Sequence, residues 1–324
     1  MLASSIAGGA VGLLYGLLAR LLFDHKQVAW LKTTFAAMSI AFLFLVPLAL
    51  GTLVVWLASL PGRRSVAYWI LAPWVPCLAF LVAVIALAWE GWICVVMAAP
   101  IFLVMASLGG AAVGLLGHYQ ARARNGAAAA LALLPFLVSP LEQRLGVREE
   151  RRDVTTAVEI AASPEAVWRQ VIRVPEIRPE EEPRGFFQAI GIPRPLEASL
   201  DREGPGGVRQ ARFVGGIRFV EAIDEWDPPH ALGFHVAVDA LSIGPRLLDR
   251  HVLVGGEYFD VEHGRFVIEP LGPARVRLVL TSRHRLDTHL NGYAGLWTDA
   301  VMRDLQLGIC RVIKGRSERS KESS

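Results

Sequence analysis

Two titratable side chains, Glu221 and His284, occupy positions in apolar strand patterns from which they could act in acid–base catalysis. Glu221 alternates with Phe219 and Ile223, and His284 follows Ser282 at the end of another alternating apolar segment. Alternate side chains of a strand point to one face, so each of the two shares a face with apolar neighbours. If those faces are buried, an inward Glu and His could act as general acid and base. The alternative is that Glu221 lies on a solvated face and His284 at a strand end in water.

The histidines and cysteines do not form a metal-binding pattern. His284 and His289 are five residues apart, without a carboxylate or cysteine to complete a zinc ligand set. Cys77 and Cys94 lie in apolar runs, Cys310 is far from both, and no C-x-x-C pair exists. We therefore expect no metal and no cofactor. We also expect no nucleic-acid partner, because the net charge of +3 is spread without a basic block.

The elements that would position Glu221 and His284 lie in the second of two very different halves. Residues 1–141 carry nine charged side chains, whereas residues 142–324 carry fifty-four. A water-soluble domain could not bury the first half, and a bilayer would not accept the second. We expect a transmembrane helical region over residues 1–141, a connector over 142–153, a ligand-binding domain over 154–316 and a disordered tail over 317–324.

Four apolar runs in the first half contain no Asp, Glu, Lys or Arg, and each has the roughly 18 residues that a membrane-spanning helix needs. These runs are Leu2–Ala19, Thr33–Leu60, Ser65–Trp89 and Gly91–Gly117. A fifth run, Asn125–Leu141, is shorter and contains two prolines, so it could span, lie re-entrant or rest at the interface. The first half is thus predicted to be an all-α transmembrane bundle of four or five helices.

The arginines and lysines near the run ends predict an orientation, because positively charged loops stay on the cytoplasmic side. With four spans, eight of them share the side of the second half and three lie opposite. With five spans, seven share that side and four lie opposite. Both counts place the second half in the cytoplasm and the protein in the cell (inner or plasma) membrane as a multi-pass protein.

Small residues recur at every fourth position in two of the apolar runs. This spacing lets helix backbones approach closely in lipid. It predicts a duplicated packing element or a homo-oligomer face, and chance composition is the alternative. The residues are Gly8, Gly12 and Gly16 in the first run and Ala106, Gly110 and Gly114 in the fourth.

The second half begins with a strand pattern over Val154–Ile160 and a helix start at Ser163–Trp168, where Ser163 suits the cap and Pro164 the first turn. A short second helix could begin at Phe186. Six further strand patterns follow, separated by turn-like residues such as Glu262–Gly264. They cover Val208–Val214, Ile217–Glu225, Ala231–Val238, Val252–Glu262, Arg265–Glu269 and Ala274–Leu286.

A long amphipathic helix closes the chain. Apolar residues recur at three- and four-residue steps from Tyr293 to Ile313, and Gly315 can end the helix. Short strands joined by turns indicate one antiparallel sheet with one buried face. The second half is therefore predicted to be an α+β domain.

This order of elements resembles the START-like superfamily of helix-grip domains, which includes polyketide cyclases/dehydrases and lipid-transfer proteins. The segment Val158–Trp168 matches that family's opening strand and its Ser/Ala-Pro-Glu-x-Val-Trp helix. The segment Phe219–Phe234 and the closing helix add to the likeness, which covers about half of the chain, Val154–Lys314. The resemblance implies a curved antiparallel sheet around a long C-terminal helix, with an apolar cavity between them. It implies no particular reaction.

The cavity that the resemblance implies would be lined by apolar residues from the sheet and from the closing helix. An ordinary filled core is the alternative for the same residues. The candidates are Phe219, Ile223, Phe234, Tyr258, Leu278, Leu280, Trp297, Val301 and Leu305.

Three functions fit these features. The leading hypothesis is a membrane-anchored binding or transfer module for an apolar small molecule, such as a lipid, isoprenoid or polyketide-like compound, with membrane lipids as partners. The second is a cyclase/dehydrase-type enzyme in which Glu221 and His284 take acid–base roles. The third is a membrane protein that senses such a ligand. We place binding ahead of catalysis.

Overall fold

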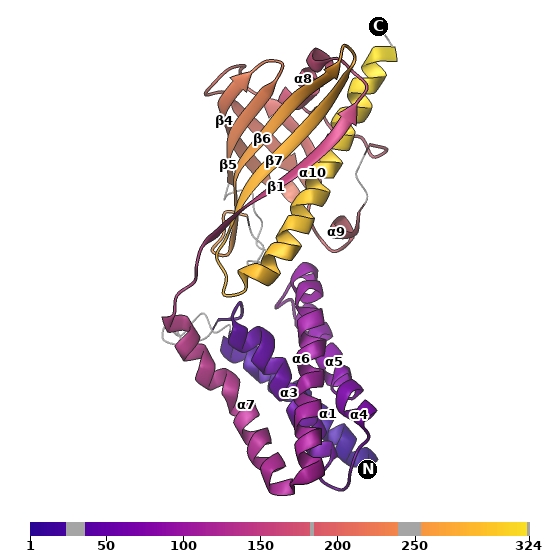
Figure 1. The fold of residues 1–324 in the computed structure, drawn as a ribbon, viewed down its shortest axis with the longest axis vertical. Helices are drawn as coiled ribbons and strands as arrows, with labels where there is room; N and C mark the ends of the chain where they lie inside the picture. The colour runs from indigo at the N-terminus through magenta and orange to yellow at the C-terminus, as the bar shows by residue number, and fades with distance from the viewer. Residues whose placement is uncertain (24–35, 182–184, 239–253, 323–324) are drawn as a thin grey trace. The chain divides into compact units, whose positions relative to one another are not determined.

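The computed structural model describes residues 1–23, 36–181, 185–238 and 254–322, which fall into two compact units (Figure 1). The first unit is Met1–Arg148 with Thr288–Leu290, and the second is Glu149–Asp287 with Asn291–Ser324. The expected connector over 142–153 is shorter than predicted. Helix α7 continues to Arg144 and strand β1 begins at Glu150, because β1 pairs with β7 from its first residue onward.

The described part of the first unit is helical. Its elements are α1 (Leu2–Phe23), η1 (Ala41–Leu45), α3 (Val46–Ala58), α4 (Val66–Leu71), α5 (Trp74–Ala86), α6 (Trp92–Tyr119) and α7 (Ala121–Arg144). Five helical stretches are long and apolar enough to cross a membrane. One is the marginal fifth run, which forms a helix of 24 residues despite Pro135 and Pro140. At 1.5 Å per residue it is about 36 Å long, enough for a hydrocarbon core of about 30 Å.

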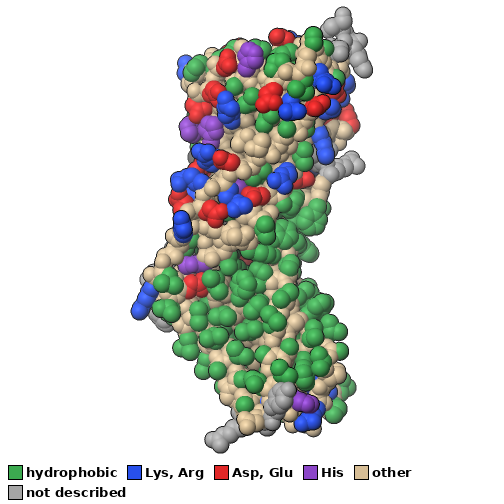
Figure 2. Space-filling view, in the orientation of Figure 1, with side chains coloured by type: hydrophobic (Ala, Val, Ile, Leu, Met, Phe, Trp, Pro, Cys, Tyr) green, Lys and Arg blue, Asp and Glu red, His purple; other side chains and the backbone are tan. Residues whose placement is uncertain are grey.

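Large apolar side chains remain exposed on this unit. Figure 2 shows hydrophobic side chains gathered over its visible face. Val75, Leu137 and Val82 are 73%, 70% and 64% exposed. A surface of this kind is unfavourable in water and suits a lipid environment.

Charged side chains lie at the helix ends of this unit. Arg20, near the end of α1, is buried and contacts Glu90 between α5 and α6, with 2.5 Å between Nη2 and Oε1. Arg64, before α4, donates to the Met1 and Ala58 carbonyl oxygens. The apolar middle of each helix is therefore left uninterrupted by charge.

The small-residue faces are used inside the chain. A Cβ added at Gly8 would lie 2.6 Å from the carbonyl oxygen of Val54, and one at Gly12 would lie 2.6 Å from a Val54 methyl carbon. A Cβ at Gly110 would lie 2.2 Å from the carbonyl oxygen of Trp69. The faces expected to offer a homo-oligomer surface are thus occupied by α3 and α4 of the same chain. Close packing within the bundle explains their spacing.

The second unit is one curled antiparallel sheet closed by a long helix, which is the helix-grip fold expected. The sheet order is β1-β7-β6-β5-β4-β3-β2, and α10 packs against β1, β7 and α8 (Figure 1). The strands are β1 (Glu150–Ile160), β2 (Pro195–Leu200), β3 (Val208–Phe213), β4 (Arg218–Asp227), β5 (Ala231–Val238), β6 (Phe259–Gly272) and β7 (Arg275–Leu286). The helices are α8 (Pro164–Ile172), α9 (Phe186–Ala189) and α10 (Asn291–Glu322).

Two strand predictions were wrong in detail. Glu262–Gly264, expected to be a turn, lies inside β6, where the register shifts between Val261 and His263 and pairing with β7 continues, with Gly264 opposite Ser282. Strand β2 was not predicted because Pro195–Leu200 is short and lacks a run of β-branched residues. The strand predicted over Val252–Glu262 begins only at Phe259, because residues 254–258 form turns and bends; residues 252 and 253 lie outside the described residues.

Helix α10 does not end at Gly315 but continues to Glu322. Arg316 and Arg319, which follow the glycine, both bind the carboxylate of Glu181. These contacts hold the final turns, so most of the tail expected to be disordered is helical.

One end of the space between sheet and helix is filled. Ser163 caps α8 by accepting a hydrogen bond from the Ala166 N–H at 3.3 Å, as its position predicted. The apolar face of α8 then packs Trp168 against Trp226, with ring centroids 5.1 Å apart. Cys310 and Ile313 of α10 belong to the same core cluster.

Candidate functional site

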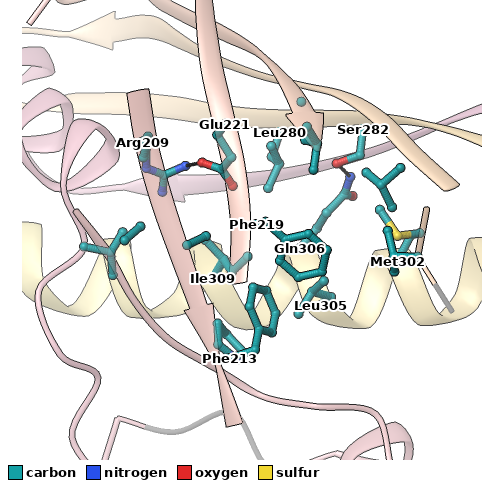
Figure 3. Close-up of a pocket in the computed structure, with 18 of the residues that line it drawn as sticks. Arg209, Phe213, Phe219, Glu221, Leu280, Ser282, Met302, Leu305, Gln306 and Ile309 are labelled. Atoms are coloured by element: carbon teal, nitrogen blue, oxygen red, sulfur yellow. Dashed lines mark hydrogen bonds and ion pairs between the residues drawn. The ribbon is translucent and has the colours of Figure 1, made fainter. Parts of the chain in front are cut away.

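The other end of the space between the sheet and α10 is a cavity of about 180 Å³. Strands β2 to β7 form one wall and α10 the other, and nearly all of the lining is apolar (Figure 3). Phe213 and Phe219 form part of it as an edge-to-face pair with ring centroids 4.9 Å apart. The cavity lies beyond the reach of α8, whose bulky side chains fill the interior at the other end.

Five of the predicted lining residues are at this cavity. Phe219 and Phe234 approach from β4 and β5, and Leu280 from β7. Val301 and Leu305 face them from α10, one turn apart. The strand alternation and the helical stripe thus placed these residues on facing surfaces.

Four predicted lining residues are placed elsewhere. Ile223 and Leu278 lie in the packed core beside α8, because they are farther along β4 and β7 than the cavity extends. Tyr258 precedes β6, and its neighbour Phe259 lines the cavity instead. Trp297 lies one turn before Val301 on α10, and the lining begins at Val301.

A buried ion pair is the main polar feature of the cavity wall. Arg209 of β3 donates from Nη1 to Oε2 of Glu221 on β4 at 2.5 Å (Figure 3). The two residues pair directly across the strands and are 4% and 8% exposed. The Arg209 guanidinium also lies over the rings of Phe234 and Phe266, 5.5 and 5.9 Å from their centroids. Burial raises the pKa of Glu221, and the charge of Arg209 opposes that rise.

His284 is buried outside the cavity wall. Its Nε2 lies 3.0 Å from the hydroxyl of Thr298 and 3.6 Å from Oδ1 of Asp299, both on α10. Its Nδ1 has no hydrogen-bond partner among the described residues. Burial lowers the pKa of His284, which favours the neutral ring. The alternative of a solvated Glu221 and His284 was therefore wrong, because both are buried.

The structure does not bring Glu221 and His284 together. Strands β5 and β6 separate β4 from β7 in the sheet. With about 4.8 Å between neighbouring strands, the two side chains start roughly 14 Å apart along the sheet. They are too far apart for direct proton transfer, and only Glu221 lines the cavity.

A buried amide fixes α10 to the sheet at the cavity floor. Gln306 donates from Nε2 to the Val154 carbonyl oxygen and to the Ser282 hydroxyl, both at 2.9 Å. Its Oε1 accepts from the Thr156 hydroxyl at 2.7 Å. Ser282 and Gln306 both line the cavity and form its second polar group.

The sequence prediction missed Arg209 and Gln306. Arg209 alternates with Ala211 and Phe213, which would place a charge on an apolar face, and Gln306 interrupts the apolar stripe beside Leu305. Each was a polar residue at a predicted inward position. Its partner could not be inferred, because that depends on which strand lies beside it.

No metal site is formed by the described residues: no three or more His, Cys, Asp and Glu side chains among them are arranged to hold an ion. The fold and the cavity together define a helix-grip domain with an apolar interior.

No protein-family model matches this sequence, and no curated protein matches it. Among solved structures, it is similar to the ZhuI aromatase/cyclase from Streptomyces sp. R1128, with 16% identity, a TM-score of 0.34 and coverage of 52% of this chain and 95% of that one. It is also similar to a START superfamily protein from Mycobacterium smegmatis, with 17% identity, a TM-score of 0.34 and coverage of 52% and 97%.

A third similar structure is norcoclaurine synthase from Thalictrum flavum in complex with dopamine and hydroxybenzaldehyde. It has 12% identity, a TM-score of 0.32 and coverage of 56% of this chain and 91% of that one. At these identities and scores, the similarities assign neither a reaction nor a ligand to this chain.

Proposed function

We propose that this protein is a membrane-anchored module that binds a small apolar molecule in the cavity between its sheet and α10. The observation that carries the proposal is the unfilled space itself, lined by side chains such as Phe219, Phe234 and Val301. Ligand pockets of proteins are concave and mostly apolar, with a few polar groups that orient the ligand. The pairs Arg209–Glu221 and Ser282–Gln306 are such groups here.

The first unit supports the membrane part of the proposal. Its described residues offer five apolar helices of membrane-spanning length and expose leucines and valines on their surface. Apolar molecules concentrate in a bilayer, so anchoring keeps a binding domain near its ligand. With five spans, the count of arginines and lysines favours a cytoplasmic second unit.

Binding is favoured over the cyclase/dehydrase-type alternative by the placement of the two acid–base candidates. Glu221 is held by Arg209, and His284 lies outside the cavity wall. A general acid and base must both reach the reacting molecule. The cavity does not provide that arrangement with these two residues.

Native mass spectrometry of the full-length, detergent-purified protein tests the proposal. We expect an additional mass that survives detergent removal and that organic extraction releases as a small apolar molecule. A homogeneous apo mass in gentle detergent, together with no uptake of added apolar probes, would contradict the proposal.

The Val301→Trp variant distinguishes a cavity from a filled core. Val301 lines the cavity, so we expect a Trp there to occupy the space and displace the ligand while the melting temperature is retained. In a filled core the same change overpacks and costs about 1–3 kcal/mol. Arg303→Trp, on the exposed face of α10, is the matched control and should change neither property. A destabilised Val301→Trp variant whose parent holds no ligand would favour the filled core.

A further inference from the structure

One end of the cavity, which we call the pole, carries the ion pair Arg209–Glu221, and the net charge of this pair is zero. Among the described lining residues, Arg209 and Glu221 are the charged side chains that are buried. Glu197 and His263 also line the cavity, but their side chains are 29% and 28% exposed and pair with Arg212 and Asp224. A bound molecule therefore meets a positive and a negative group already joined to each other.

Arg209 keeps unused hydrogen-bonding capacity at this pole. A guanidinium has five N–H donors. The described contacts use Nη1 on Glu221, so Nη2 donates to none of the described residues, and the enclosed Nε has no partner among them either. A buried donor without a partner is costly, so an acceptor oxygen that reached this group would be favoured.

The pairing disfavours a charged ligand. A carboxylate that bound Arg209 would compete with Glu221 and leave a buried carboxylate with less compensation. Breaking a buried pair in this way is strongly destabilising. An ammonium group would draw Glu221 from Arg209 with the same result. A hydroxyl or carbonyl oxygen can accept from Arg209 while the pair stays intact.

The volume that the described residues line indicates the size of the group that the cavity holds. An apolar cavity of about 150 Å³ in another protein takes up benzene. The cavity here, at about 180 Å³, therefore fits one ring with a short substituent or a fragment of that size. The aromatic residues Phe213, Phe219 and Phe234 suit an aromatic ring.

From these observations we infer that the ligand is an uncharged, one-ring-sized apolar molecule whose hydroxyl or carbonyl oxygen binds the Arg209–Glu221 pair, and that the pair rejects carboxylates. The inference rests on the proposed function and names the class of molecule that the same cavity selects.

Three probes of matched shape test it: ethylbenzene, 4-ethylphenol and 4-ethylbenzoate. Each is titrated calorimetrically into full-length protein in lipid nanodiscs at pH 8, and empty nanodiscs correct for partitioning into lipid. We expect 4-ethylphenol to bind at least tenfold more tightly than 4-ethylbenzoate and several-fold more tightly than ethylbenzene.

Binding of 4-ethylbenzoate that is as tight as, or tighter than, binding of 4-ethylphenol would overturn the inference. Equal binding of ethylbenzene and the phenol would overturn it too, while leaving the proposed function standing. If none of the three binds, the proposed function itself fails.

Two variants change the charge of the Arg209–Glu221 pair, one by removing only the carboxylate and the other by removing both charges. Glu221→Gln leaves Arg209 with an unbalanced charge, so the preference should reverse toward 4-ethylbenzoate. Glu225→Gln is the matched control, because Glu225 lies on the same strand and pairs with Arg265 at an exposed site.

If Glu221→Gln does not fold, the double variant Arg209→Met with Glu221→Met removes both charges at similar volume. In that variant the phenol should lose its advantage over ethylbenzene, and a retained advantage would contradict the role of the pair.

Discussion

Glu181 holds two distant segments of the second unit together. Its carboxylate accepts from Arg316 at 2.7 Å and from Arg319 at 2.5 Å, so it joins the loop after α8 to the last turns of α10. The Arg316 hydrogen bond is the main cause that lowers the pKa of Glu181 to about 2. The Glu181 side chain is 10% exposed, so water screens the contact only in part.

The lowered pKa predicts a pH-dependent contribution to stability. A carboxyl whose folded pKa is depressed stabilises the fold above its unfolded pKa, which is about 4.3. That contribution is lost as the pH falls from about 4.3 through about 2. We therefore expect Glu181→Gln to lower the melting temperature at pH 7, and the difference from the parent protein to shrink across this window.

Glu180→Gln serves as the control for Glu181→Gln, since Glu180 is an exposed neighbour of the same type. It should leave the melting temperature unchanged at every pH. A melting-temperature difference for Glu181→Gln that stayed constant down to pH 2 would show that the carboxylate charge is not what stabilises this contact.

At the scale of elements, α10 grips the sheet at points separated by the cavity. Gln306 fixes its middle to β1 and β7, and Arg152 of β1 binds Asp299 nearer its start, with 2.6 Å between Nη2 and Oδ2. Cys310 and Ile313 pack farther along the helix. These fixed points hold α10 in place while the space beside Val301 and Leu305 remains unfilled.

In the first unit, the contact between α3 and α6 depends on a missing side chain. A Cβ at Gly51 would lie 1.9 Å from the carbonyl oxygen of Ala106, which is too close for any residue but glycine. We expect Gly51→Val to force these helices apart and to lower the melting temperature and yield of the detergent-purified protein. Gly9→Val is the control, because a Cβ there meets nothing within 4 Å. Equal behaviour of the two variants would refute the close contact between α3 and α6.

At the scale of the whole molecule, the chain combines a unit suited to lipid with a unit suited to water. The first exposes leucines and valines, and the second covers its sheet with ion pairs such as Arg283–Asp153 and Arg265–Glu225. Figure 2 shows the hydrophobic and the charged side chains on separate parts of the chain. This division supports the proposal that one unit anchors the other.

Fusions to reporter proteins test the orientation. With five spans and a cytoplasmic second unit, a phosphatase after Ser324 should be inactive and a green fluorescent protein there should fluoresce. A phosphatase fused after Arg64, which follows the second span, should be active. Inactivity at Arg64 with a cytoplasmic Ser324 would indicate four spans. Strong phosphatase activity at Ser324 would reverse the orientation.

The sequence by itself determined the architecture of both units. Uninterrupted apolar runs predicted helices of membrane-spanning length, and alternation such as Val276, Leu278 and Leu280 against Arg275 and Arg277 predicted a one-sided sheet. The closing helix and its apolar stripe were predicted from residue spacing. These features follow from local periodicity, which depends only on residues close together in the sequence.

Only the tertiary structure decided which inward residues meet and where the interior stays unfilled. Phe219 and Ile223 share a face of β4, yet one lines the cavity and the other is in the core, because α8 covers only one end of the sheet. Periodicity indicates on which face of a strand a residue lies, but not whether a helix such as α8 packs over that position. Arg209 pairs with Glu221 because β3 lies beside β4, and His284 is distant from both because β5 and β6 intervene. Partnership across strands depends on register and strand order, which long-range packing determines.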